Sequence, residues 1–539
     1  MLGHAPPDPI PGQRHHPPLY WLLAWVAAWT LTGLIGHTPW RGDESVQLAL
    51  ALDTLAHGHW LAPELGRLAW LDTPPWAVWW SAVAIAASKP WLAAHDAARL
   101  PGMLALLLTF WALLRWSLPR LQRRDRWAAG LALFAAMALV IPAHSAASEL
   151  WTLAGIALLT AGLSRPDRRW PRTAILLGAG IGIATMAGGL QLWLAASLAT
   201  GAVSALAPRR SQHRAHIVGV LLGSLPVLLW ALGLAQQGLL GPWLQADPLL
   251  AVLGGHVRPG GGFFAEVRGL LWTWPLWPLA LAIIWHRRGH LATDPRLLAP
   301  LAIIVSALPI WWVTPGGIDT RALALLAPLA LLAGPGLLRL ERGQAQALHA
   351  FGVVLFASLL GLLWLFWAGA HLGGPEPFAG RVGRLLRSYD GSWQAWQVVV
   401  GVAASAGAAL LVFGLRRSAL RPLLAWCIGA SATWLLIIVL GGHWLETRFS
   451  FRSMAVLAGQ HWPQAGCVGA APGLRPAVVA SIRIYTGHTV LRGAAAEQCD
   501  WRFATVSRNG SGVPKDAEVI WRGRRGGDRQ ELHVLYRRP

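Results

Sequence analysis

Charged side chains are scarce in this chain. Asp, Glu, Lys and Arg make up only 13% of its 539 residues, whereas 55% are hydrophobic and the mean hydropathy is +0.46. A soluble globular domain has about 25% charged residues, so this composition excludes an ordinary soluble fold. Apolar segments of membrane-spanning length instead recur along most of the chain, and they predict a polytopic helical membrane protein.

Lysine is rare in this chain, and nucleotide-binding motifs are missing. Lysine occurs only at Lys89 and Lys515, so arginine supplies nearly all of the 45 basic residues. The sequence has no glycine-rich nucleotide-binding motif and no nucleophile elbow, which disfavours a cytoplasmic nucleotide-sugar site. The stretch Met1–Pro18 lacks a cleavable signal pattern, so we expect the first apolar segment to be an uncleaved anchor.

The positions of the basic residues indicate how the chain is oriented in the membrane. Although the net charge is +21, the arginines cluster in short loops after every second apolar segment, as in Arg120–Arg126 and Arg165–Arg172. Short basic loops face the cytoplasm, so the other loops face outside and no nucleic-acid partner is expected. The pattern predicts about thirteen spans: Leu19–Ile35, Leu100–Trp116, Ala128–Ile141, Leu150–Leu163, Ala174–Met186, Leu190–Leu206, Ile217–Ala235, Leu270–Trp285, Leu297–Val313, Ala322–Leu338, Ala347–Ala370, Val398–Leu415 and Leu423–Leu440.

The chain divides into three predicted parts. Residues 1–18 form a cytoplasmic tail, residues 19–440 form the membrane domain with a periplasmic first loop at 36–99, and residues 441–539 form a periplasmic domain. Within the first loop, Trp76–Ala87 is apolar but too short to cross a bilayer, which predicts an interfacial helix on the outer leaflet. The fold class is therefore an all-α polytopic membrane protein with a small C-terminal α/β domain.

The tail has a mixed polarity that the membrane domain lacks. Alternating stretches such as Ala477–Tyr485 and Glu531–Tyr536 are typical of strands, and Asn509-Gly510 is typical of a turn. Cys467 and Cys499 both lie in this tail. An oxidising periplasm would permit a disulfide between them, and a free pair of thiols is the open alternative.

The strongest functional signal is the adjacent carboxylate pair Asp43 and Glu44, a few residues after the first span. Carboxylates at the exit of a transmembrane helix are costly near hydrocarbon and are often functional. Neighbours in a helix point about 100° apart, so one of the two should be the primary group. The pair predicts acid–base or electrostatic chemistry on a lipid-borne substrate. The alternative is a solvated pair stabilised by the dipole of the helix that follows.

Further polar residues fall in the predicted outer segments. Glu149 begins a span, His256 and Arg258 lie in a glycine-rich loop, and Arg321 precedes another span. The arginine fork suits a phosphate, and glycines allow the loop to approach a ligand closely. The alternatives are a dipole-stabilised carboxylate at Glu149, a merely flexible loop, and an ion pair between Asp319 and Arg321.

A metal site is a weaker hypothesis. His57 and His59 are two residues apart, a spacing that does not place both on one helical face. The sequence therefore predicts no metal and no cofactor, with a divalent ion held by both histidines and Asp43 as the alternative.

The run from Arg41 to Pro101 resembles the first outer loop of GT-C glycosyltransferases, in the bacterial branch related to aminoarabinose (lipid A) transferase and protein O-mannosyltransferases. The resemblance extends in order over about the first 340 residues. Three lysines typical of the family are missing, one at Thr73, one within Thr185–Gly188 and one near Arg321. The matching motifs are Asp43-Glu44, Gly58–Pro63, Thr73–Pro75, Ala98–Pro101, Glu149, His256–Pro259 and Arg321–Gly334.

The resemblance implies an inverting glycosyltransferase of the bacterial inner membrane. Its donor would be a polyprenyl-phosphate-linked sugar, its acceptor a glycolipid, of lipid A type, or a protein, and membrane lipid would surround it. Two rivals remain: a pseudo-transferase that has lost catalysis with the lysines, and a lipid-handling transporter, which the nearly charge-free span interiors disfavour. The implied roles are Asp43 as general base, Glu44 and Glu149 as assisting carboxylates, and Arg258, Arg321, His256 and Arg67 as groups at the donor phosphate.

Overall fold

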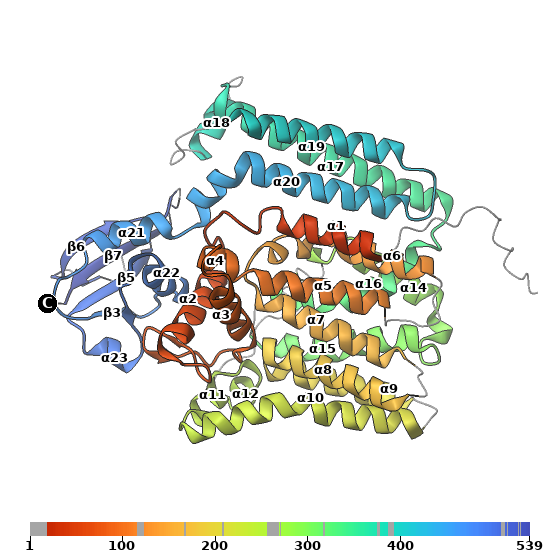
Figure 1. Cartoon of the computed structure of the whole chain (residues 1–539), viewed down its shortest axis with the longest axis horizontal. Coiled ribbons are helices and arrows are strands. Elements are labelled where there is room, and N and C mark those ends of the chain that lie inside the picture. The colour runs from red at the N-terminus through yellow and green to blue at the C-terminus, as the bar shows by residue number, and fades with distance from the viewer. Residues whose placement is uncertain are drawn as a thin grey trace, which may run out of the picture.

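Long helices lie side by side along one direction, and a small sheet domain sits at one end of them (Figure 1). The computed structural model describes residues 19–115, 123–165, 169–206, 210–255, 269, 271–315, 318–373, 378–385, 393–507, 513–514, 516–526, 528 and 530–538. Each predicted span contains a helix: α1 (Leu19–Leu31), α5 (Leu100–Arg115), α6 (Arg123–Phe134), α7 (Ser148–Leu163), α8 (Trp170–Gly188), α9 (Leu190–Ala205), α10 (Arg210–Gln236), α14 (Leu276–His286), α15 (Pro295–Val313), α16 (Ile318–Leu337), α17 (Arg342–His371), α19 (Ala395–Gly414) and α20 (Arg421–Phe449).

Some of these helices are long enough to cross a membrane, and others are shorter. Within the described residues, six helices are long and apolar enough to cross a membrane, and a bent pair raises the number to seven. A mostly helical polytopic chain is therefore confirmed, whereas the larger number of about thirteen spans stays a prediction. The six are Ala94–Leu114, Arg210–Gln236, Pro295–Val313, Arg342–His371, Ala395–Gly414 and Arg421–Phe449.

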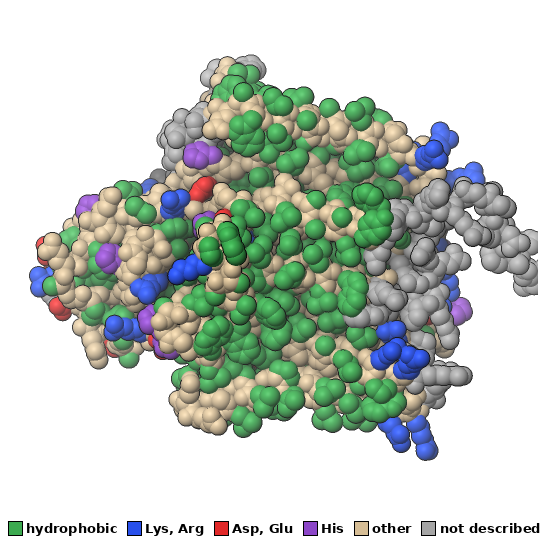
Figure 2. Space-filling model, in the orientation of Figure 1, with side chains coloured by type: hydrophobic (Ala, Val, Ile, Leu, Met, Phe, Trp, Pro, Cys, Tyr) green, Lys and Arg blue, Asp and Glu red, His purple; other side chains and the backbone are tan. Residues whose placement is uncertain are grey.

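The outer surface of the long helices is apolar. Hydrophobic side chains cover most of the visible face of the helical region, and basic side chains lie toward its two ends, one away from the sheet domain and one near it (Figure 2). Leu221, Leu232 and Leu410 are each more than 60% exposed. Water would make such an apolar surface unfavourable by about 25 cal/mol per Å², so these side chains fit a hydrocarbon environment.

The predicted span Ala128–Ile141 is not one straight helix. Helix α6 ends at Phe134, the 3-10 turns η1 (Met137–Leu139) and η2 (Pro142–His144) follow, and the axis bends by 62°. At the break Ala136 is extended, and the backbone N–H of Met137 donates to the Trp274 carbonyl. The bend therefore depends on a partner far along the chain.

The first outer loop is mostly helical. Helix α2 begins with two carboxylates in its first turn, which the helix dipole favours, and ends at Gly58, whose φ of 76° suits glycine. Helix α3 confirms a helix at the predicted interfacial segment. The elements of this loop are α2 (Gly42–His57), β1 (Glu64–Leu65), β2 (Leu68–Ala69), α3 (Trp76–Ser88) and α4 (Ala94–Ala97). Short helices elsewhere are α11 (Leu240–Ala246), α12 (Pro248–Leu253), η3 (Arg288–His290), α18 (Phe378–Leu385) and α21 (Arg452–Gln460).

The C-terminal domain is a five-stranded mixed sheet with strand order β4-β3-β5-β7-β6. Strand β3 pairs in parallel with β4 and β5, whereas β7 pairs antiparallel with β5 and β6. The predicted boundary at residue 441 falls inside α20, which continues to Phe449. The elements are β3 (Val468–Ala470), α22 (Pro476–Thr486), β4 (Val490–Leu491), α23 (Ala494–Glu497), β5 (Trp501–Ser507), β6 (Glu518–Gly523) and β7 (Glu531–Arg537).

One strand prediction in this domain is wrong. Ala477–Tyr485 lies within helix α22, and Val478 and Ile482 are buried. These two residues are four apart, so the same short apolar run fits one face of a helix as well as a strand. Glu531–Tyr536 is confirmed as strand β7, and Asn509-Gly510 lies outside the described residues.

The sheet domain packs against the first outer loop. Buried Val46 and Leu48 of α2 belong to the same hydrophobic cluster as Val478 and Ile482 of α22. A Cβ added at Gly42 would lie 3.0 Å from the Cβ of Ala477, so the start of α2 approaches α22 closely. Anything bound at α2 is therefore near the sheet domain as well as the membrane helices.

Cys467 and Cys499 form a disulfide, and 32 positions separate them in the sequence. A cross-link around a loop of this length stabilises a fold by roughly 3–4 kcal/mol through the unfolded state. We expect the Cys467→Ser/Cys499→Ser variant to lose about this much in the unfolding of the sheet domain, measured by limited proteolysis. Wild type treated with reductant should match the variant, and equal protease resistance of oxidised and reduced protein would contradict the expectation.

Candidate active site

Asp43 and Glu44 face different environments, although they are neighbours in the first turn of α2. The Asp43 side chain is 88% exposed, whereas Glu44 is only 2% exposed. This matches the 100° separation expected of adjacent helical residues. Asp43 is therefore the carboxylate that can reach a substrate, and Glu44 is enclosed by protein.

Glu44 is paired with a buried arginine. The Arg99 Nε donates to Glu44 Oε1 at 2.6 Å, and the backbone N–H groups of Ala146 and Trp40 donate to the same carboxylate at 3.2 Å each. Trp40 is a near neighbour in sequence, but Arg99 and Ala146 are 55 and 102 positions away, so Glu44 joins α2 to the starts of α5 and α7. A fully hydrogen-bonded, buried ion pair of this kind holds one local geometry.

Arg99 itself is fully buried, with 0% exposure. Its Nη1 donates to the carbonyls of Leu34 and His37, each at 2.9 Å, and to Asp96 Oδ1 at 3.1 Å. Two carboxylates and two carbonyls thus surround one guanidinium, and its Nη2 lies 3.3 Å from His37 Nδ1. The end of α1 and the start of α5 are connected through this single side chain.

The network makes stability depend on pH. Burial alone would raise the pKa of the Glu44 carboxyl, but the adjacent Arg99 guanidinium lowers this pKa below its ordinary 4.5. Burial, and then Arg99, lower the pKa of His37 below 6.5. For each group the unfolded chain binds more protons at acid pH, so folding free energy is lost as the pH falls below the unfolded pKa.

We therefore expect the melting temperature of the solubilised protein to fall below pH 6.5 through His37 and further below pH 4.5 through Glu44. The difference in melting temperature between wild type and Glu44→Gln isolates the second contribution. This difference in melting temperature should be largest near neutral pH and should shrink as the pH falls and the Glu44 carboxyl becomes protonated. A difference that stays constant down to pH 3 would contradict this assignment.

Arg41 brings the exposed Asp43 and the predicted Glu149 together. Its Nη2 donates to Glu149 Oε1 at 2.9 Å and lies 3.7 Å from Asp43 Oδ2. Arg41 precedes α2 with an extended backbone, and Glu149 lies in the first turn of α7 and is 6% exposed. The structure thus joins Asp43 and Glu149 through one cation, where α2 and α7 begin.

The predicted phosphate-binding residues are only partly placed. His256 and Arg258 lie outside the described residues, and so does the side chain of Asp319. Arg321 is buried in the first turn of α16 and donates to the Thr314 carbonyl. Helix α16 packs against α7, the helix that begins with Glu149 in its first turn.

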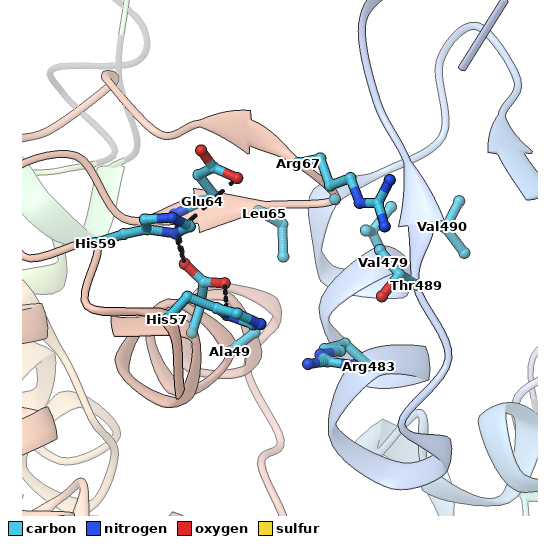
Figure 3. A pocket seen from close by; sticks show the side chains of 12 residues that line it. Ala49, His57, His59, Glu64, Leu65, Arg67, Val479, Arg483, Thr489 and Val490 are labelled. Carbon is cyan, nitrogen blue, oxygen red and sulfur yellow. Dashed lines mark hydrogen bonds and ion pairs between the residues drawn. The ribbon is translucent and has the colours of Figure 1, made fainter. Parts of the chain in front are cut away.

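Arg67 and the histidine pair lie elsewhere. They line a cavity of about 460 Å³ between the β1–β2 hairpin and the sheet domain (Figure 3). The carboxylate beside His57 and His59 is Asp53, not the predicted Asp43. Asp53 is ten positions after Asp43 on α2, or about 15 Å along the axis. The structure therefore does not bring Arg67 together with Asp43 and Glu149.

Sequence reasoning assigned no role to Arg41 or Arg99, although both lie in the motifs that carry the resemblance. The available signal was charge: Arg41 lies near the start and Arg99 at the end of the predicted loop 36–99, which also contains two adjacent carboxylates. A carboxylate that becomes buried is usually paired with a cation, and these arginines are candidates for that partner. Which arginine it is depends on the fold.

The chain has a GT-C-like fold. It is similar to the crystal structure of ArnT from Cupriavidus metallidurans in the apo state, with a TM-score of 0.68 at 17% identity over 96% of this chain and 98% of that chain. Against the same protein bound to undecaprenyl phosphate, the TM-score is 0.67 at 16% identity over 96% and 97%. The predicted resemblance to these glycosyltransferases is thus confirmed at the level of the fold. No family model and no curated protein sequence matches the chain.

Proposed function

We propose that this chain is a glycosyltransferase that moves a sugar from a polyprenyl-phosphate donor to an acceptor outside the bacterial inner membrane. A glycolipid of lipid A type is the favoured acceptor. Two observations support the proposal: similarity of fold to ArnT over nearly the whole chain, and a solved structure of that ArnT with undecaprenyl phosphate. The observation that carries the chemistry is the exposed Asp43 beside the Arg41–Glu149 pair.

The proposed reaction uses Asp43 as general base. The Asp43 carboxylate takes the proton of an acceptor hydroxyl as its oxygen attacks the anomeric carbon of the donor sugar. The bond between that carbon and the phosphate oxygen breaks, polyprenyl phosphate leaves with the electron pair, and the anomeric configuration inverts. If the acceptor oxygen already belongs to a phosphate, Asp43 orients it instead.

The other residues of the site assist this step in the proposal. Glu149 orients Arg41, and the Arg41 guanidinium positions the Asp43 carboxylate. Glu44 acts as a positioning residue, because Arg99 occupies its carboxylate. Arg321, with Arg258 and His256, holds the donor phosphate through charge-assisted hydrogen bonds. A role for Arg67 at this phosphate has no support from its position.

The proposed topology follows the distribution of charge. We place residues 1–18 in the cytoplasm, the loop 36–99 in the periplasm and the domain from 441 to 539 also in the periplasm. The basic side chains at the end away from the sheet domain support this orientation (Figure 2). Asp43 would then meet a donor carried in the outer leaflet.

Mass spectrometry of lipid A and envelope glycans tests this function directly. Cells with the gene, cells without it and cells carrying Asp43→Ala are compared. Loss of the same sugar mass from both mutant strains would identify the acceptor and support transfer. No change in any fraction, with the protein folded and present in the membrane, would favour a pseudo-transferase that binds the donor without turnover.

A further inference from the structure

A carboxylate and two imidazoles converge at the C-terminal end of α2. Asp53 Oδ1 lies 2.8 Å from His57 Nδ1, and Asp53 Oδ2 lies 2.9 Å from His59 Nδ1. Glu64 Oε2 is 4.0 Å from the same nitrogen of His59. Histidine residues two apart do not share a helical face, but the left-handed turn at Gly58 brings His59 back over the helix end.

We propose that Asp53, His57 and His59 form a Zn²⁺ site. One ligand atom from each residue lies within 4.8 Å of the other two. Two imidazole nitrogens and one carboxylate oxygen are a donor set that zinc uses, with a fourth position left for water or a further ligand. The proposal is independent of sugar transfer, because the cluster is about 15 Å along α2 from Asp43.

The distances in the cluster are close to those that zinc requires. Ligands 2.0–2.2 Å from a tetrahedral ion lie about 3.3–3.6 Å from one another. The observed separations of 2.8 and 2.9 Å are hydrogen bonds, in which the Nδ1 protons occupy the place of the ion. Replacing those protons requires each hydrogen-bonded pair to separate by about 0.5 Å, and the ligand atoms, which lie within 4.8 Å of one another, to adopt the tetrahedral spacing. The side chains have room for this, since His57 is 48% and His59 37% exposed.

The surroundings hold the carboxylate in place and keep the fourth position accessible. The backbone N–H of Glu64 donates to Asp53 Oδ2 at 3.0 Å, a fixed second contact of the kind that orients metal ligands. The cluster lines the 460 Å³ cavity, with His57, His59 and Glu64 on one side and Arg67 and Arg483 on the other (Figure 3). Two carboxylates balance the ion, so the arginines leave an excess of positive charge that favours an anion as a further ligand.

A bound ion would link α2 to the segment that leads into the β1–β2 hairpin. Asp53 and His57 belong to α2, and His59 and Glu64 lead into the β1–β2 hairpin. The hairpin in turn accepts a hydrogen bond from the sheet domain, where the N–H of Arg492 donates to the Gly66 carbonyl at 2.9 Å. Zinc would therefore stabilise the contact between α2, the hairpin and the sheet domain.

Zinc titration of the purified full-length protein tests the site. The protein carries an affinity tag without histidine, is stripped with a chelator, and competes for Zn²⁺ with a chromophoric indicator. We expect wild type to bind one ion per chain and to gain melting temperature with zinc. Asp53→Asn and His59→Gln should weaken binding by on the order of 100-fold, because loss of an outer-shell partner alone costs 10–100-fold.

The matched control is His461→Gln, which removes an exposed histidine outside the cluster and should bind zinc as wild type does. Melting curves without zinc establish that each variant is folded. Failure of folded wild type to bind stoichiometric zinc would overturn the proposal and leave a proton-bridged cluster. Zinc affinity of Asp53→Asn equal to that of wild type would also overturn it.

Discussion

Asp43→Asn is expected to lower the rate of sugar transfer by on the order of 10²–10⁴-fold, the usual contribution of a general base. The amide keeps the size of the side chain but cannot accept the proton. Because the side chain is 88% exposed, folding and membrane insertion should not change. The measurement is transfer from a polyprenyl-phosphate-linked sugar in proteoliposomes that contain the purified protein and its acceptor.

A control substitution distinguishes the loss of the catalytic base from the general effect of removing one negative charge. Asp500→Asn removes an exposed carboxylate from the sheet domain and should leave transfer unchanged. Donor binding supplies a second readout, since Asp43→Asn should retain it if the residue acts only on the acceptor. Transfer by Asp43→Asn at the wild-type rate would exclude Asp43 as the base. Donor binding by wild type without any turnover would instead support a pseudo-transferase.

Arg99→Met is expected to destabilise the protein by about 3–5 kcal/mol, the range measured when one member of a buried ion pair is removed. Glu44 and Asp96 would then remain buried without their cation, and the carbonyls of Leu34 and His37 would lose a donor. Methionine retains much of the arginine side chain's apolar volume, so the loss reports on charge and hydrogen bonds. Thermal unfolding of the protein in detergent, followed by tryptophan fluorescence, measures the effect.

A double variant tests the same explanation. Glu44→Gln in the Arg99→Met background removes one orphaned charge, so it should recover part of the lost melting temperature. Arg452→Met is the control, because Arg452 is 61% exposed and lies 3.9 Å from Glu446. An exposed pair contributes about 0–1 kcal/mol. A loss for Arg99→Met no larger than for Arg452→Met would show that the buried network does not stabilise the outer loop.

The position of the carboxylate pair was visible in the sequence, but the sequence did not show which of the two is buried and which is exposed. Helical geometry alone predicts that Asp43 and Glu44 point in different directions. It does not say which one faces the interior, because that depends on where Arg99 lies after the chain has folded. Glu149 was identified by its place at the start of a span, yet its contact with Arg41 joins residues 108 positions apart.

Local patterns determined most of the helices. A run of apolar residues long enough for a bilayer forms a helix whatever its neighbours do, because its backbone groups must be satisfied internally. Each predicted span accordingly contains a helix. The sequence was less decisive for Ala477–Tyr485, where a short apolar run fits either period, and for the bend near Ala136, which depends on Trp274.

By itself, then, the sequence determined a polytopic helical membrane chain with an α/β tail, a GT-C-like fold and a carboxylate pair after the first span. The membrane chain and its tail follow from composition and periodicity, and the GT-C-like fold is what the resemblance of short motifs to a known family implied; all of these are local properties of the sequence. Only the tertiary structure decided that Glu44 is buried on Arg99, that Arg41 joins Asp43 to Glu149, and that Asp53 meets the two histidines. Each of those contacts depends on a turn or on the packing of separate segments, and local composition does not specify either.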